Sequence, residues 1–88
     1  LKALYLINYV EAVADYTKAI ELHSDPHEED FYCMRGFARH ELNDYAGAIA
    51  DYNKALELNT NAAWGSLPFA RTNLFLAQKM LLESKKGD

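Results

Sequence analysis

Three residue types are scarce in this sequence. Its 88 residues include one cysteine (Cys33), two prolines and four glycines. A single cysteine excludes an internal disulfide and a cysteine-rich zinc site. The shortage of glycine and proline disfavours a β architecture built on many tight turns.

Basic residues are also few, and no segment is both long and apolar. Nine Lys and Arg oppose 13 Asp and Glu, for a net charge of −4. Domains that bind duplex nucleic acid usually carry the opposite balance, so we expect no nucleic-acid partner. No apolar run approaches the roughly 18–20 residues that cross a bilayer, and the N-terminus lacks the plan of a signal peptide. With the lone cysteine, these absences predict a cytoplasmic protein without a membrane span.

What is present is a globular composition and an internal repeat. Half of the residues are hydrophobic and a quarter are charged, which fits one folded domain. Residues 8–22 (NYVEAVADYTKAIEL) align without a gap with residues 44–58 (DYAGAIADYNKALEL), 36 positions later, and nine of the fifteen positions are identical. Such self-similarity at a fixed offset is typical of repeat architectures.

Both copies have the apolar spacing of a helix. In the second copy, Tyr45, Ala48, Ile49, Tyr52 and Leu56 recur at the i, i+3, i+4, i+7 spacing of one helical face. Residues 25–42 predict another helix, opened by an Asp-Pro start signal, and residues 43–44 (Asn-Asp) predict a tight turn into the second copy. A helical pattern runs over 67–83. The last helix is capped either by Thr60 or Asn61, with a start at Ala62, or by Ser66, and a break or bend near 65–68 is favoured.

The second unit resembles the tetratricopeptide repeat. That family has a bulky aromatic early in the first helix and a small residue four positions on, then a small, an aromatic and a small residue in the second helix. In residues 29–62 these positions hold Tyr32, Gly36, Ala48, Tyr52 and Ala55. The first copy matches from its turn onward, with Tyr9, Ala12, Tyr16 and Ala19.

The resemblance covers roughly residues 1–62 and has visible departures. Arg35 and Arg39 stand where Leu and Tyr are commoner, Thr60 replaces the closing Pro, and the first inter-repeat loop is two residues longer. The family pattern has a packing reason, because small residues such as Gly36 and Ala48 let the helices of a unit approach closely.

The resemblance implies an all-α fold, a solenoid of stacked antiparallel helix pairs with a C-terminal packing helix. We expect residues 1–28 to be a partial first repeat, formed by the end of one helix, a complete second helix and a linker. Residues 29–62 would be a complete repeat, and residues 63–88 a capping or packing helix with its tail. The chain is thus expected to begin inside a repeat and to expose an unfinished N-terminal face.

No group of residues predicts catalysis, a cofactor or a metal site. His23 and His27 are four apart, but Pro26 interrupts the helix that would bring them together. Cys33 and His40 lie two helical turns apart, about 10 Å, which is too far for a nucleophile and its base. Asp15 and Asp51 are explained by the repetition itself. We therefore expect a protein that is not an enzyme.

By the same resemblance, the first helices line a concave wall that binds an extended peptide or a partner's helix. The inward positions are Asp30, Cys33, Phe37, His40 and Glu41, and Arg71 extends the wall from the last helix. Phe37 favours a binding role because an aromatic facing away from the core needs a partner. Met34 replaces the Asn of family members that grip acidic chaperone tails, and Glu41 and Asp30 repel such tails. The prediction is a non-catalytic scaffold or adaptor with a neutral to mildly basic partner.

A second hypothesis is an assembly module or a fragment of a larger complex subunit. The last helix has two apolar stripes, one with Leu67, Leu74 and Leu81 and the other with Phe69, Leu76 and Met80. One stripe packs on the preceding repeat, and the other is either partly exposed or an interface. Under this second hypothesis the chain would self-associate through the C-terminal helix or the truncated N-terminal face.

Overall fold

The computed structural model describes residues 2–22, 28–58 and 67–86. These ranges contain four α-helices and no strand: α1 (Lys2–Leu22), α2 (Glu28–Glu41), α3 (Tyr45–Leu58) and α4 (Leu67–Lys86). The predicted all-α fold of stacked antiparallel helices is confirmed.

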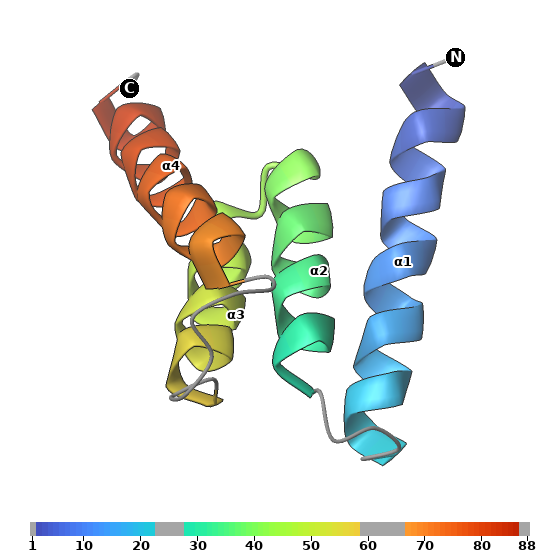
Figure 1. The fold of residues 1–88 in the computed structure, drawn as a ribbon. Coiled ribbons are helices and arrows are strands. Elements are labelled where there is room, and N and C mark those ends of the chain that lie inside the picture. Colours follow the sequence, from blue (N-terminus) through green and yellow to red (C-terminus); the bar gives the residue numbers. More distant parts are fainter. Residues whose placement is uncertain (1, 23–27, 59–66, 87–88) are drawn as a thin grey trace.

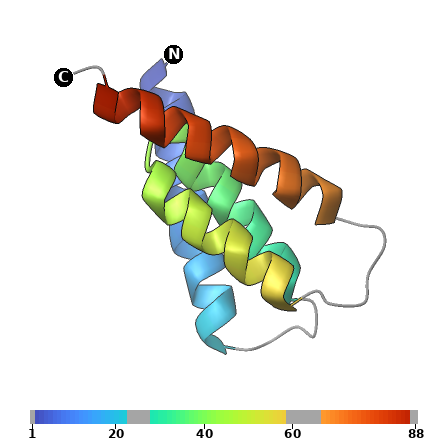
Figure 2. The same cartoon turned by 90° about the vertical axis from the view of Figure 1, so that its left-hand side faces the viewer.

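The helices form a row in which each one packs against the helix before it (Figure 1). α3 lies between α2 and α4, and Figure 2 shows α3 and α4 side by side and running in opposite directions. α1 packs on α2 alone among the four helices. The result is an elongated body with principal extents of 41 × 26 × 19 Å.

The predicted turn at residues 43–44 is present, and its backbone explains the choice of residues. Asn43 has a φ of 66°, a left-handed conformation that Asn tolerates better than most residues. The amide of Asp44 donates to the carbonyl of Arg39 and the amide of Asn43 to that of His40, which closes the end of α2. The Asp44 carboxylate then accepts a hydrogen bond from the Gly47 amide at 3.0 Å and caps the start of α3.

The first copy of the repeat has no such turn. Residues 2–22 are one uninterrupted helix, so the expected end of one helix followed by a second helix within residues 1–28 is wrong. Thirty-six positions before Asn43 stands Ile7, a β-branched residue for which a left-handed backbone is costly. Without a residue that can reverse the chain, the helix continues. The Asp-Pro start signal, His23 and His27 lie outside the described residues.

The core is small and lies where α2, α3 and α4 meet. Its buried members are Cys33, Ala48, Tyr52, Ala55, Ala70 and Ala77, with Tyr32, Ile49, Leu56 and Leu74 packed against them. Gly36 faces the ring of Tyr52, and a Cβ added to it would lie 3.0 Å from Tyr52 Cε1. Because that distance is tighter than ordinary contacts, glycine is what lets α2 approach α3 this closely.

Candidate functional site

Four residues of α2 share the side of the helix that faces solvent. Asp30 and Met34 are exposed, and Phe37 and Glu41 are half-buried. Their spacing of four, three and four residues places them on one stripe. We call Asp30, Met34, Phe37 and Glu41 the α2 face; it presents two apolar side chains between two acidic ones.

Phe37 joins this face to α1. Its ring lies edge-on to that of Tyr9, with centroids 6.1 Å apart and an interplanar angle of 65°. Such an edge-to-face pair is a favourable aromatic geometry. Phe37 is therefore partly covered by α1, whereas the sequence alone suggests an aromatic that faces water.

The other predicted wall residues do not all reach this face. Cys33 is fully buried, at 0% exposure, so its predicted place on a binding surface is wrong. It packs in the core with Ala70 and Ala77 of α4, which closes over it. Arg71 is exposed on α4, next to the buried Ala70.

His40 is half-buried and turned towards α3. Its ring lies edge-on to Tyr45 at a centroid distance of 5.1 Å. Its Nδ1 is enclosed and makes no hydrogen bond within the described residues. The structure thus brings Asp30, Phe37 and Glu41 together and directs Cys33 and His40 elsewhere.

A buried ionic cluster joins α1, α2 and α3. Asp51 of α3 is 2% exposed, and both of its carboxylate oxygens accept hydrogen bonds from Arg35, from Nη2 at 2.7 Å and from Nε at 2.9 Å. Arg39 Nη1 donates to the same carboxylate at 3.0 Å. Arg35 also donates from Nη1 to the hydroxyl of Thr17 on α1 at 3.1 Å. Two arginines, one carboxylate and the Thr17 hydroxyl thus connect three successive helices.

The positive charges of Arg35 and Arg39 compensate the buried negative charge of Asp51. The hydrogen bonds from Arg35 to Asp51 outweigh the desolvation of Arg35 and raise the pKa of its guanidinium above the usual value. A buried carboxylate needs such partners, because an unpaired buried charge is strongly destabilising. The guanidinium carbon of Arg35 also lies 5.3 Å from the centre of the Tyr32 ring, within cation–π range.

The sequence alone does not predict this cluster, although its members are visible there. Arg35 and Arg39 stand out as departures from apolar or aromatic positions, and they are four residues apart on one helix. The repetition of Asp51 as Asp15 hides its role, because internal repetition alone is enough to explain why both residues are present. The signal that could have revealed the cluster is the pair of arginines itself. Two arginines at helical spacing beside a mostly apolar interior need an acidic partner.

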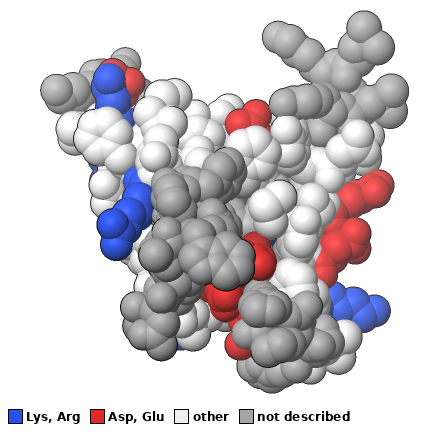
Figure 3. Space-filling view, viewed as in Figure 1, with Lys and Arg blue, Asp and Glu red and all other residues white. Residues whose placement is uncertain are grey.

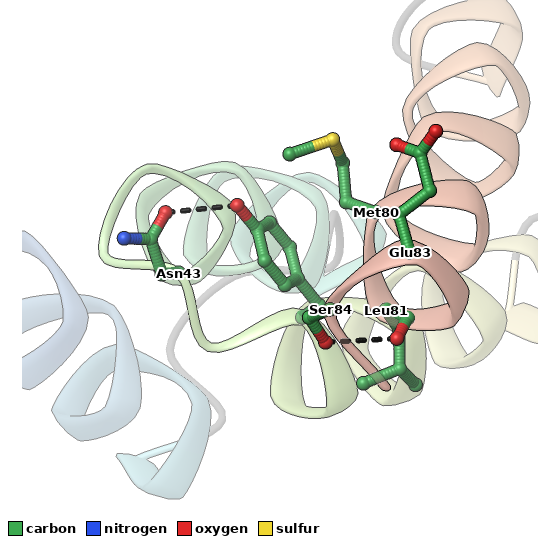
Figure 4. Close-up of a pocket in the computed structure, with 6 residues that line it drawn as sticks. Asn43, Met80, Leu81, Glu83 and Ser84 are labelled. Atoms are coloured by element: carbon green, nitrogen blue, oxygen red, sulfur yellow. Dashed lines mark hydrogen bonds between the residues drawn. The ribbon is translucent and has the colours of Figure 1, made fainter. Parts of the chain in front are cut away.

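A hollow of about 520 Å³ lies between the α2–α3 turn and the end of α4 (Figure 4). It is lined by Asn43, Tyr45, Met80, Leu81, Glu83 and Ser84. The Tyr45 hydroxyl donates to Asn43 Oδ1 at 2.8 Å, and the Ser84 hydroxyl donates to the Leu81 carbonyl at 2.8 Å. Because both hydroxyls are used within the chain, the hollow presents no activated nucleophile.

The outer side of α4 is apolar and basic. Its exposed large apolar residues are Phe75, Leu76, Met80 and Leu82. The helix carries four basic residues and one acidic residue, whereas the remainder of the chain has an acidic excess. In the view of Figure 3, the edge formed by α4 shows mainly basic side chains, and the edge formed by α1 shows acidic side chains with a basic one below them.

Metal-site and membrane-span features are absent from the three ranges that the structure describes. Within them no cluster of three or more His, Cys, Asp or Glu has the arrangement of a metal site. None of the helices there combines the length and apolar character of a bilayer-spanning segment.

The comparisons with known proteins give one match. Residues 29–61 match the family model described as tetratricopeptide repeat. Neither the comparison with curated proteins nor that with solved structures gives a match. The matched segment covers α2, the Asn43–Asp44 turn and α3, the same helical pair that carries the α2 face and the Arg35–Asp51 bonds.

Proposed function

Because the chain contains a tetratricopeptide repeat at residues 29–61, we propose that it is a scaffold or adaptor that binds a partner peptide or helix along the α2 face. Tetratricopeptide repeats generally mediate protein–protein interactions and are non-catalytic modules. The apolar and acidic side chains of the α2 face support this proposal, because a partner peptide or helix could contact them.

The observation that supports the place is the make-up of the α2 face. Met34 is 41% exposed, and Phe37 beside it keeps part of its ring open while Tyr9 supports the other part. An aromatic held by a neighbour loses little freedom on binding, which favours it as an anchor for a partner's apolar side chain.

The charges support a neutral to mildly basic partner. Asp30 and Glu41 lie at the two ends of the α2 face, eleven residues apart, or about 16 Å along the helix. Basic side chains at a matching separation would complement both carboxylates, whereas an acidic segment would be repelled. Arg71 is exposed on α4, and in this proposal it sets the polarity of a bound segment.

The experiment uses peptides selected for binding to the whole chain from a random display library, with affinity measured by fluorescence anisotropy. We expect Met34→Glu to weaken the selected peptides at least about tenfold, because a carboxylate would replace the apolar contact. Leu58→Glu is the matched control, since Leu58 on α3 is 39% exposed and the substitution is the same. Circular dichroism melting verifies that both variants fold. Peptides that bind both variants equally would refute the α2 face as the site.

A second candidate function is self-association through α4. The four exposed apolar residues of that helix, Phe75, Leu76, Met80 and Leu82, favour it. In this case the chain would act as an assembly module, and its mass in solution, measured by light scattering, tests this role.

We also propose a cytoplasmic location. The sequence has a single cysteine, Cys33, which is buried in the core and has no second cysteine with which to form an internal disulfide; this composition fits a reducing compartment. Fluorescence microscopy of the tagged protein tests the location directly.

A further inference from the structure

The hollow between the α2–α3 turn and the end of α4 is separate from the α2 face. None of the four residues of the α2 face lines it, and its own lining comes from the turn, the start of α3 and the last turns of α4 (Figure 4). Its shape follows from the packing of α4 on α3. A volume of about 520 Å³ is that of a site for a small organic group and is too large for a bare ion.

One wall of the hollow is an aromatic ring that is held in place. Tyr45, at the start of α3, is half-buried. The rings of His40 and Tyr45 lie edge-on with centroids 5.1 Å apart, and the Tyr45 hydroxyl donates to Asn43 Oδ1 at 2.8 Å. A ring fixed by two contacts loses little further freedom when a ligand packs on it. The face of such a ring attracts cations.

Among the described residues that line the hollow, one side chain is charged, and its charge is negative. Glu83 is exposed, and its carboxylate makes no hydrogen bond or ion pair with any residue that the structure describes. The two hydroxyls of the lining, those of Tyr45 and Ser84, donate within the chain. Met80 and Leu81 add apolar surface. The hollow therefore combines one available carboxylate with an aromatic and aliphatic wall.

The end of α4 adds negative potential at the same place. Glu83 and Ser84 belong to the last turn of α4, where the carbonyl groups of a helix carry a partial negative charge that favours a cation. Lys79 and Lys85 are exposed on the same helix but do not line the hollow. An anion in the hollow would be repelled by the Glu83 carboxylate and by the helix end, whereas both attract a positive group.

From these features we propose that the hollow is a binding site for a guanidinium group carried on a short apolar stem. The planar cation stacks on the Tyr45 ring and pairs with the Glu83 carboxylate, while the stem packs against Met80 and Leu81. A guanidinium fits better than an ammonium because it is planar, weakly hydrated and able to stack and pair at once. An arginine side chain of a peptide and a free guanidinium compound carry this same chemistry. The site does not depend on the α2 face.

The probes are Nα-acetylargininamide and its neutral isostere Nα-acetylcitrullinamide, titrated into the whole isotope-labelled chain and followed by nuclear magnetic resonance. The arginine compound is expected to give saturable shifts at the amides of Asn43, Tyr45, Glu83 and Ser84. We expect the citrulline compound to bind about fivefold more weakly, because it keeps the shape but loses the charge that pairs with Glu83. Butylguanidinium, which has the same cation without peptide groups, separates the two sources. Tighter binding of the arginine compound indicates a peptide ligand, and equal or tighter binding of butylguanidinium indicates a free compound.

Matched variants test the two groups that hold the cation. Glu83→Gln is expected to weaken the arginine compound about fivefold, whereas Glu11→Gln, the same change at an exposed position of α1, is expected to leave binding unchanged. Tyr45→Leu should weaken binding and Tyr45→Phe should not, since the ring and not its hydroxyl contacts the ligand. Circular dichroism melting verifies that each variant folds. Absence of saturable shifts at the hollow, equal binding of the arginine and citrulline compounds, or unchanged affinity in Glu83→Gln overturns the proposal. None of these results bears on peptide binding at the α2 face.

Discussion

Tyr52 is the largest side chain fully buried in the described part of the chain, and it sits at the centre of the helical pair. Gly36 contacts its ring, and Ala48 and Ala55 lie in the same core. Its hydroxyl is enclosed and makes no hydrogen bond to any described residue. Burial raises the pKa of this phenol well above its ordinary value, since the charged form would be desolvated.

We therefore predict that Tyr52→Phe stabilises the protein by about 1 kcal/mol at neutral pH, because it removes an unsatisfied polar group and keeps the ring. The same substitution should change the alkaline behaviour. In the wild type, Tyr52 ionises in the unfolded chain near its ordinary pKa of about 10 but stays protonated when folded, so stability is full below that pH and falls above it. Tyr52→Phe should reduce this fall. Urea unfolding at pH 7 and pH 10.5 measures both effects, and a less stable Tyr52→Phe at pH 7 would contradict the prediction.

For individual residues, the sequence predicted the close contacts of small side chains well and the solvent exposure of side chains less well. Gly36 and Ala48 lie where the repeat pattern requires close approach. Cys33 was expected on the surface, but its burial depends on α4, which is separated from it by the whole of α3. Helical periodicity within α2 carries no information on which later helix covers a given side.

Turns decide where the helical elements begin and end. Only three residues, 42–44, separate the end of α2 from the start of α3. The reversal of the chain there depends on the left-handed backbone of Asn43. The repeat alignment suggested the same boundary before Tyr9, but Ile7 stands in the place of Asn43 and the helix runs on. Repeat identity thus predicted that both segments are helical, but equal residues are buried to different degrees in the two copies, and the turn required one particular residue.

A substitution at the turn should measure this requirement. We predict that Asn43→Val destabilises the protein by about 2 kcal/mol, because a β-branched residue is strained at a φ of 66°, and because the hydrogen bond from Tyr45 to the Asn43 side chain is lost. Asn53→Val, at an exposed position of α3, is the matched control and should cost only a few tenths of a kcal/mol. Urea denaturation midpoints compare the two variants; equal midpoints would show that the left-handed residue is not limiting.

Charge is distributed unevenly along the row of helices. α4 at one end carries four basic residues, one acidic residue and exposed apolar side chains, and the acidic excess lies in the rest of the chain. Exposed apolar patches of this kind are typical of interaction surfaces. The last helix was predicted over 67–83 and is observed over Leu67–Lys86, so the sequence located it closely. Its contribution to assembly stays a prediction.

If α4 mediates self-association, Phe75→Glu combined with Leu82→Glu should convert a concentration-dependent oligomer into a monomer, because two charges would enter an apolar interface. Size-exclusion chromatography with light scattering, over a hundredfold range of concentration, gives the mass. Leu22→Glu on α1 is the control, since Leu22 is 65% exposed and Phe75 is 64% exposed. A wild-type chain that is monomeric throughout would rule out this assembly and leave peptide binding as the candidate function.

The near-identity of α1 and α3 also sets up a competition while the chain folds. Both helices carry an aspartate at the same repeat position, Asp15 in α1 and Asp51 in α3. In the folded protein the arginine pair of α2, Arg35 and Arg39, binds Asp51, so Asp15 is a possible competitor for the same two arginines. The tight Asn43–Asp44 turn holds α3 close to α2. This short tether gives Asp51 a much higher local concentration at the arginines than Asp15 has. Lengthening that turn with a flexible glycine-serine insert would weaken this advantage and allow mispaired states in which α1 captures the arginines. The shortness of one connection thereby protects the order of the helices.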